Sequence, residues 1–177
     1  MKWAVVVIDL QRDLCWAPRR KKVVQAVLPN VLKLIDVFAD RAAPIFYSRF
    51  ELEPDDVQFK RFGDVYCIRG TPGCEFIDEI LPLRGPVIKK TKHSVFFDTD
   101  LDSSLRALDV DGVVLAGLQT QICVLTSAAD AYHRGYQVVV AADAVASTRE
   151  EVRLEAVEWI DKYVGKSQSV AQIEQWL

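Results

Sequence analysis

The sequence lacks any apolar run long enough to cross a bilayer, although 50% of its 177 residues are hydrophobic. A transmembrane helix needs about 20 consecutive apolar residues, so the composition predicts a soluble protein with ample material for one core. The opening segment MKWAVVVIDLQ contains no cleavage site of small residues, which argues against a secretion signal. We therefore expect one cytoplasmic domain over residues 1–177, without a membrane partner.

Cysteine and histidine are scarce, and their arrangement argues against two kinds of site. The four cysteines show no paired CxxC spacing, so reduced thiols are expected rather than a disulfide framework or a zinc site. The two histidines, His93 and His133, cannot supply three histidine ligands. With a net charge of −3 and no basic run of five or more residues, the chain is not expected to bind nucleic acid.

Strand-like and helix-like segments alternate along the chain. The apolar runs WAVVVID, PIFYSR, GPVIKK, GVVLAG and YQVVVAAD are separated by stretches with helical periodicity, such as residues 22–40. This βαβ order predicts an α/β fold whose parallel sheet is covered by helices on both faces. Residues 50–80 interrupt the order with an irregular excursion that contains Pro and Gly, and long loops of this kind are usually functional or mobile.

The stretch GLQTQICVLTSAADAYHRG places Cys123 where a strand passes into a helix. Residues 112–117 form an apolar run typical of a buried strand, and the helical periodicity that follows ends before Gly135. At a helix N-terminus, N–H groups and the helix dipole favour a thiolate and can hold an oxyanion. Cys123 is therefore a candidate nucleophile for a carbonyl carbon. The alternative is a cysteine that only packs, as expected for the other three.

Two other strand-like runs also end in charged residues. Asp9 follows the first run, and Lys89 and Lys90 end GPVIKK. Because ligands bind outside the carboxyl ends of parallel strands, a carboxylate, an amine and Cys123 are expected to meet there. Such a set suits acyl transfer, with Asp9 accepting the thiol proton and Lys90 holding the charges in place. Singly, Asp9 could be a loop cap and either lysine a surface charge.

Taken together, several blocks resemble the isochorismatase-like cysteine hydrolases, the group that includes nicotinamidases and N-carbamoylsarcosine amidohydrolase. They are VVVIDLQ, RGTPGCEFIDEI, VIKKTKHSVFFDTDL, GLQTQICV and DAYHRGYQVVVAADA, in that order over nearly the whole chain. The resemblance implies a three-layer α/β/α fold with a six-stranded parallel sheet, whose short last strand lies near GKSQS. It also implies a triad of Asp9, Lys90 and Cys123, since the family lysine lies four residues before the serine of an SxF element, here Ser94. Lys89 and Lys92 would then be bystanders.

The resemblance implies further features of the site. A non-proline cis peptide would join Leu118 to Gln119, and the backbone N–H groups of Gln119 and Cys123 would form an oxyanion hole. Asp9 would deprotonate Cys123, the thiolate would attack an amide or ureido carbonyl, and water would hydrolyse the thioester. Relatives assemble as dimers or tetramers, so a homo-oligomer is expected. No cofactor is implied.

Candidate pocket residues come from the same blocks and from the aromatic side chains near them. They are Gln11, Trp16, Arg49, Phe50, Tyr66, Phe96, Phe97 and Ile122. Arg49 could hold a substrate carboxylate in a bidentate fork or form an ordinary surface salt bridge. His93 could touch the substrate or lie at the surface, and core packing would explain most of the aromatic residues equally well.

Differences between this sequence and particular members of the family reduce the number of activities that the resemblance allows. Members that cleave the vinyl ether of isochorismate lack the nucleophilic cysteine, so the sequence argues against that reaction. Nicotinamidases hold a metal with an Asp and several His after the second strand, where this chain reads FYSRFELEPDD. An all-carboxylate site from Glu51, Glu53, Asp55 and Asp56 would suit only a hard, weakly held cation. A solvated loop is favoured there, and no metal is predicted.

The sequence thus predicts a cofactor-free cysteine amidohydrolase for a small amide, carbamoyl or ureido compound. Two alternatives stay open. One is nicotinamidase or pyrazinamidase activity without the usual metal. The other is a catalytically silent oligomer that keeps the fold and binds a small metabolite, against which the intact Asp9, Lys90 and Cys123 count.

Overall fold

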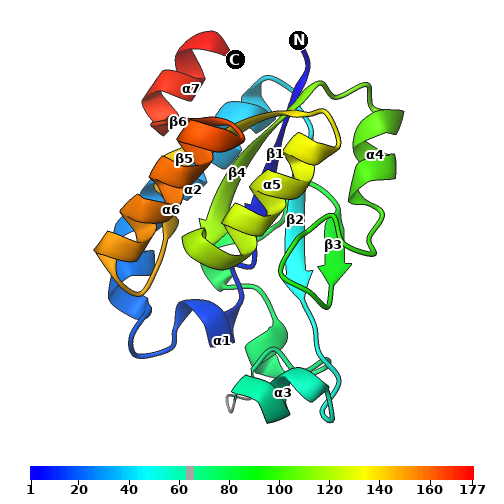
Figure 1. Ribbon diagram of the computed structural model, residues 1–177, viewed down its shortest axis with the longest axis vertical. Coiled ribbons are helices and arrows are strands. Elements are labelled where there is room, and N and C mark those ends of the chain that lie inside the picture. The colour runs from blue at the N-terminus through cyan, green and yellow to red at the C-terminus, as the bar shows by residue number, and fades with distance from the viewer. Residues whose placement is uncertain (63–65) are drawn as a thin grey trace.

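Six parallel strands form one sheet at the centre of the computed structural model, which describes residues 1–62 and 66–177 (Figure 1). In chain order they are β1 (Trp3–Ile8), β2 (Ile45–Phe50), β3 (Val87–Lys90), β4 (Gly112–Leu118), β5 (Gln137–Ala146) and β6 (Lys166–Gln168). Their order across the sheet is β3-β2-β1-β4-β5-β6, and every pairing is parallel. The predicted six-stranded parallel sheet is confirmed, including its short last strand.

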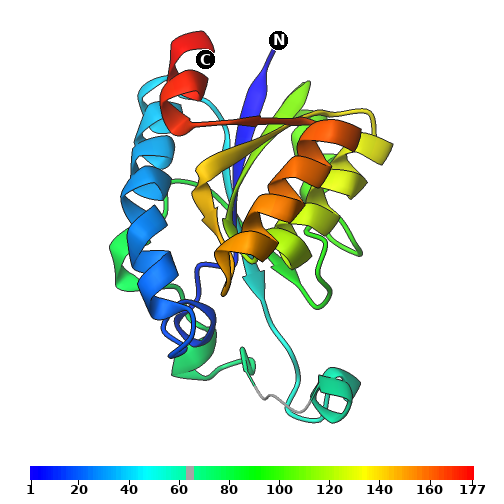
Figure 2. The same cartoon turned by 60° about the vertical axis from the view of Figure 1, so that its left-hand side comes forward.

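Helices cover both faces of this sheet, as Figure 2 shows. The helices are α1 (Arg12–Cys15), α2 (Lys21–Asp40), α3 (Val57–Phe62), α4 (Leu101–Ala107), α5 (Leu125–His133), α6 (Glu150–Tyr163) and α7 (Val170–Trp176). Buried side chains of α2 and α7 join the core on one face, and those of α4, α5 and α6 join the core on the other. The three-layer arrangement is therefore confirmed. No helix in the described ranges is both long and apolar enough to cross a membrane.

The central strands are apolar along their whole length because both of their faces are buried. In β1, Val5 and Val7 pack into the core under α2, whereas Ala4, Val6 and Ile8 pack into the core under α5 and α6. Successive side chains of a strand point to opposite faces, so a continuous apolar run supplies both cores. This is why WAVVVI is a strand although it shows no alternation of polar and apolar residues.

The long excursion between β2 and β3 is held against the carboxyl end of the sheet. It contains α3 and two short 3-10 turns, Pro72–Cys74 and Asp78–Ile80. Isolated bridges tie Gln11 to Phe76 and Leu52 to Ile68. In Figure 1 the arrowheads of β2, β3 and β4 point toward α1 and α3. The excursion thus borders the edge of the sheet where the polar strand ends meet.

The order of the strands reverses between β1 and β4. The chain passes from β1 outward to β2 and β3, then returns beside β1 with β4 and continues outward to β5 and β6. In open α/β sheets, ligands bind in the crevice at such a switch point, outside the carboxyl ends of the strands. The fold therefore predicts a ligand site at the carboxyl ends of β1 and β4, which are followed by Asp9 and by the segment that contains Cys123.

Candidate active site

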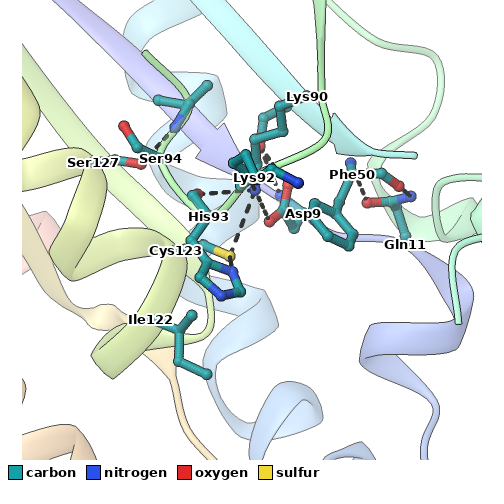
Figure 3. A network of polar contacts seen from close by, with 12 residues as sticks. Asp9, Gln11, Phe50, Lys90, Lys92, His93, Ser94, Ile122, Cys123 and Ser127 are labelled. Carbon is teal, nitrogen blue, oxygen red and sulfur yellow. Dashed lines mark hydrogen bonds and ion pairs between the residues drawn. The ribbon is translucent and has the colours of Figure 1, made fainter. Parts of the chain in front are cut away.

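The structure brings together the side chains of Asp9, Lys90 and Cys123 (Figure 3). Asp9 follows strand β1, Lys90 is the last residue of β3, and Cys123 lies in the turn after β4. Lys90 Nζ lies 2.7 Å from Asp9 Oδ2 and 3.5 Å from Cys123 Sγ. Asp9 also acts on the thiol of Cys123, since its negative charge raises the pKa of that thiol after burial has done so. An acid, a cation and a thiol are therefore in direct contact at the switch point of the sheet.

Asp9 is fixed by its own backbone and by the neighbouring strand. Its φ of 55° is left-handed, a conformation that Asp tolerates better than most residues. Its backbone N–H lies 3.2 Å from Ser48 Oγ, and Ser48 Oγ donates a hydrogen bond of 2.6 Å to Asp9 Oδ1. Because Ser48 engages Oδ1, the other carboxylate oxygen is left for Lys90 and for a proton from Cys123.

Lys90 is buried, whereas its neighbour Lys89 points away from the site. The side chain of Lys90 is 0% exposed and that of Lys89 is 64% exposed, as the alternation of a strand requires. Lys90 Nζ also lies 3.1 Å and 3.0 Å from the carbonyl oxygens of Lys92 and His93. Burial opposes the ammonium charge, but Asp9 and Cys123 outweigh it and raise the pKa of Lys90 above its ordinary value. Lys90 therefore remains a cation.

Cys123 lies in a π-helical turn, Thr120–Val124, that leads from β4 into α5. Gln119 O accepts hydrogen bonds from the N–H groups of Ile122 (3.0 Å) and Val124 (3.2 Å), which fix the turn. Just before it, Gly117 has a φ of +108°, and a Cβ there would lie 2.1 Å from Ile8 O. Only glycine permits this close approach of β4 to β1. Widened turns of this type occur frequently at functional sites.

The surroundings of Cys123 act on its thiol in the opposite direction to its helix. Burial and the negative charge of Asp9 raise the pKa of the thiol to about 12, although Lys90 acts in the opposite direction. The helix N-terminus favours a thiolate, but burial and the negative charge of Asp9 act in the opposite direction. The resting site holds a thiol, a carboxylate and an ammonium group, so the thiol needs a base.

The expected cis peptide between Leu118 and Gln119 is also wrong. Among the residues that the structure describes, only the Leu81–Pro82 bond is cis. A trans bond between residues other than proline is favoured by about 2.5–4 kcal/mol. Here Gln119, with φ −85° and ψ 144°, enters the π-helical turn from an extended conformation. The chain reaches Cys123 without the costlier isomer.

A cavity of about 160 Å³ opens onto the reacting groups. Its lining consists of Asp9, Leu14, Arg20, Phe50, Tyr66, His93, Leu118, Gln119, Ile122 and Cys123. The cavity is small beside the roughly 300–1,000 Å³ of typical ligand pockets, so it suits a compact molecule. Phe50, Tyr66 and Ile122 line it as the sequence predicts.

Gln11 supports the pocket wall and does not itself line the cavity. Its side-chain amide donates to Phe50 O (2.8 Å) and to Cys74 O (2.7 Å), and its Oε1 accepts from Phe50 N (2.8 Å). The prediction of Gln11 as a pocket residue is wrong in that sense. The amide bonds across two chain segments and positions Phe50, whose ring lies 4.9 Å from Lys90 Nζ.

Four other predicted pocket residues, Arg49, Phe96, Phe97 and Trp16, lie outside the lining. Arg49 forms ion pairs with Glu51 and Glu75, because it points to the opposite side of β2 from Phe50. Phe96 is 2% exposed and stacks on Tyr136 in the core, while Phe97 is 56% exposed. Trp16 packs against the core under α2. These residues carry the right chemistry but face elsewhere.

The lining also contains residues that the sequence did not single out. Leu14 and Arg20 come from the segment between β1 and α2, and His93, named only as a possible contact, lies between β3 and α4. His93 Nδ1 is 4.0 Å from Cys123 Sγ, and its ring stacks on Phe50 with centroids 6.4 Å apart. Burial and the charge of Lys90 lower the pKa of His93, so its imidazole is neutral at neutral pH.

The acidic residues after β2 do not fit a metal site. Glu51 is buried and contacts Arg49, Arg69 and Lys89, and Glu53 pairs with Arg69 at 2.8 Å. Side chains already held by arginines are not free to ligate a cation. Across the described ranges, no three His, Cys, Asp or Glu side chains are grouped to hold a metal. The expectation of a solvated loop is wrong for Glu51, which anchors an ion-pair network.

Comparison with known proteins identifies the family and the fold. The Isochorismatase domain model matches residues 3–172. An isochorismatase-like hydrolase from Alkaliphilus metalliredigens superposes with a TM-score of 0.92 at 29% identity, over 100% of both chains. N-carbamoylsarcosine amidase from Thermoplasma acidophilum gives 0.87 at 32% identity, over 96% of this chain and 97% of that one. Nicotinamidase 3 of Arabidopsis thaliana is 30% identical, over 84% of this chain and 75% of the relative.

Proposed function

The chain belongs to the isochorismatase family, and from that premise we propose that it is a cysteine-dependent amidohydrolase. It cleaves a carbon–nitrogen bond of a small amide, carbamoyl or ureido compound through a thioester intermediate. The observation that carries the proposal is the contact of Lys90 Nζ with both Asp9 (2.7 Å) and Cys123 (3.5 Å) beside a small cavity. The amidases among the relatives support the same class of reaction.

The first half of the reaction acylates the thiol. Asp9 takes the proton of Cys123, and the thiolate attacks the substrate carbonyl carbon to form a C–S bond. The backbone N–H groups of Gln119 and Cys123 are the proposed donors to the oxyanion. Protonated Asp9 then gives its proton to the leaving nitrogen, and the C–N bond breaks. Lys90 remains charged and keeps the carboxylate and the thiolate in place.

The second half returns the enzyme to its resting state. Water loses a proton to Asp9 and attacks the thioester carbonyl, and the C–S bond breaks as the acid product forms. The sulfur recovers its proton from Asp9. Since burial and Asp9 raise the pKa of Cys123 to about 12, the thiolate is a good proton acceptor at the end of the cycle.

Ammonia release tests the proposed function. The purified protein is incubated with a panel of small primary amides, ureides and N-carbamoyl amino acids, and a Cys123→Ala variant is run in parallel. Release by the wild type alone is the expected result. If the variant releases ammonia as fast as the wild type from the compounds that react, the cysteine mechanism is wrong.

Nicotinamide belongs in the same panel because the cavity has an aromatic wall. Phe50 stacks on His93 with an interplanar angle of 15°, and its ring centroid lies 6.0 Å from that of Tyr66. Flat rings of this kind suit a planar aromatic amide. Nicotinamidase activity without the usual metal is therefore the second candidate, and faster ammonia release from nicotinamide than from any aliphatic compound would favour it.

Asp9→Asn is expected to reduce kcat about 10³-fold while lowering the pKa of Cys123. The amide cannot accept the thiol proton, so the reaction stops. Burial is the main cause of the raised pKa of Cys123, about 12, and the negative charge of Asp9 adds to it. The substitution removes that charge, whereas Lys90 still favours the thiolate. The ultraviolet absorbance of the thiolate, followed against pH with Cys123→Ala as the blank, measures this shift. An unchanged thiol pKa would mean that Asp9 does not act on the sulfur.

A further inference from the structure

Arg20 stands apart from the other partly buried arginines. Arg12, Arg49, Arg134 and Arg153 each form an ion pair with a carboxylate. Arg20 is also partly buried and lines the cavity beside Cys123, yet its guanidinium has no ion pair or hydrogen bond within residues 1–62 and 66–177. A cation withdrawn from water without a partner is costly, so its partner is expected to come from outside the chain.

The backbone of Arg20 is fixed, and its charge is directed inward. Arg20 immediately precedes α2, its N–H donates to Ala17 O at 2.8 Å, and its carbonyl accepts from Val24 N at 2.9 Å. Burial raises the pKa of the thiols of Cys15 and Cys67, and the charge of Arg20 opposes that rise at both. Both sulfurs belong to fully buried residues, so the guanidinium charge acts on the interior below the cavity.

The other charges in the cavity cancel, which leaves Arg20 as the excess charge. Asp9 is neutralised by Lys90 at 2.7 Å. His93 is kept neutral because burial and Lys90 lower its pKa. The rest of the lining is apolar or uncharged. A small cavity with one excess positive charge, set among Leu14, Phe50 and Tyr66, favours a ligand with one negative charge.

We propose that Arg20 binds a carboxylate of the substrate, so that the substrate is a compact acid carrying its amide, carbamoyl or ureido group within reach of Cys123. Planar guanidinium and planar carboxylate pair through two parallel hydrogen bonds, which fix orientation as well as distance. Arg20 is then the residue that selects acids over neutral amides. The binding of the carboxylate by Arg20 does not depend on the proposed function. Only the cleavage of the amide-type group of the same substrate at Cys123 rests on it.

Alkylation of Cys123 tests this role without requiring turnover. Iodoacetate and iodoacetamide are nearly the same size, react with the same thiolate, and differ in one carboxylate. We expect the ratio of their second-order rate constants, iodoacetate over iodoacetamide, to fall at least about 10-fold in Arg20→Gln, since charge-assisted hydrogen bonds contribute on this scale. Arg20→Lys should retain part of the ratio. Arg19→Gln, which removes the exposed neighbouring charge, should leave it unchanged.

A second measurement uses the reaction itself. N-carbamoylglycine and its methyl ester are compared by ammonia release, and the wild type is expected to prefer the acid about 100-fold in kcat/KM. In Arg20→Gln this preference should fall to within a few-fold of unity, mainly through KM for the acid.

The two readouts separate the two proposals. A ratio of alkylation rates that is the same in wild type, Arg20→Gln and Arg19→Gln would overturn the role of Arg20, whether or not ammonia is released. A fall confined to the Arg20 variant would support it even if no compound in the panel were hydrolysed, and in that case the proposed function alone would fail. Equal kcat/KM for the acid and the ester would also overturn it.

Discussion

Replacing Cys123 with alanine is expected to abolish hydrolysis, with a fall in kcat of at least about 10⁴-fold for every compound that the wild type cleaves. The variant loses the atom that forms the thioester, while Asp9 and Lys90 keep their ion pair of 2.7 Å. Water activated by Asp9 could still attack the substrate directly, but without covalent catalysis and with poorer geometry. Initial rates of ammonia release at saturating substrate measure the effect.

The fold should survive this change, because Cys123 is partly exposed and borders the cavity. A matched control is Cys15→Ala, which removes a fully buried thiol of α1. That variant should lose about 1–3 kcal/mol of stability and keep its turnover per folded molecule. If both variants keep the circular dichroism spectrum of the wild type, and only Cys123→Ala loses kcat, the chemistry is assigned to Cys123. Residual turnover above about 1% in Cys123→Ala would contradict the thioester mechanism.

Thiol labelling gives the same assignment without a substrate. Cys15, Cys67 and Cys74 are buried, and Cys123 alone among the four is partly exposed. Alkylation of the native protein should therefore occur at Cys123, and peptide mass spectrometry identifies the site. Because the pKa of Cys123 is raised to about 12, the rate should rise with pH well beyond the range of an ordinary thiol. A catalytically silent protein could label in the same way, so labelling complements the assay.

The convergence of Asp9, Lys90 and Cys123 was predictable from the sequence because parallel strands bring their carboxyl ends to one edge. Each residue ends or follows an apolar run, and the runs are strands β1, β3 and β4. The choice of Lys90 over Lys89 depends on which face of β3 each one takes. Strand periodicity separates the two lysines but does not tell which face meets the site, and the spacing to Ser94 supplied that information.

Pocket residues were harder to predict because their segments follow no periodicity. Arg20 lies in the loop between α1 and α2, and His93 lies in the turn after β3. Hydrophobic patterns say nothing about where such segments return to the sheet. Arg49 and Phe50 lie on a regular strand, and there the periodicity itself limits the prediction. They are neighbours on β2, and a prediction that names both must be wrong for one, because successive side chains face opposite sides.

The charge state of the thiol could not be predicted from local sequence. The strand-to-helix position of Cys123 indicates a helix N-terminus, which favours a thiolate. Burial and Asp9, which is more than a hundred residues away in the chain, outweigh it and raise the thiol pKa to about 12. Local sequence thus identifies the nucleophile, whereas the contacts between distant strands decide how it is activated.

Lys90→Met is expected to reduce kcat at least about 10³-fold, against less than about 3-fold for Lys89→Met. Without Lys90, the buried Asp9 carboxylate loses its cation, and burial then disfavours the charged form that accepts a proton. A protonated Asp9 cannot accept the proton of Cys123. Lys89 is 64% exposed and lies 4.0 Å from Glu51, and Glu51 keeps its ion pairs with Arg49 and Arg69. Comparable losses in the two variants would mean that Lys90 is not the catalytic lysine.

Stability separates a catalytic role of Lys90 from a structural one. Removing one partner of a buried ion pair costs about 3–5 kcal/mol, so Lys90→Met should unfold at a lower urea concentration than the wild type. The double variant Asp9→Asn, Lys90→Met removes both charges and should recover most of that loss, since no buried charge is left unpaired. Its turnover should nevertheless stay as low as that of either single variant. Recovery of activity together with stability would show that the ion pair only holds the fold, whereas recovery of stability alone requires both charges in the reaction at Cys123.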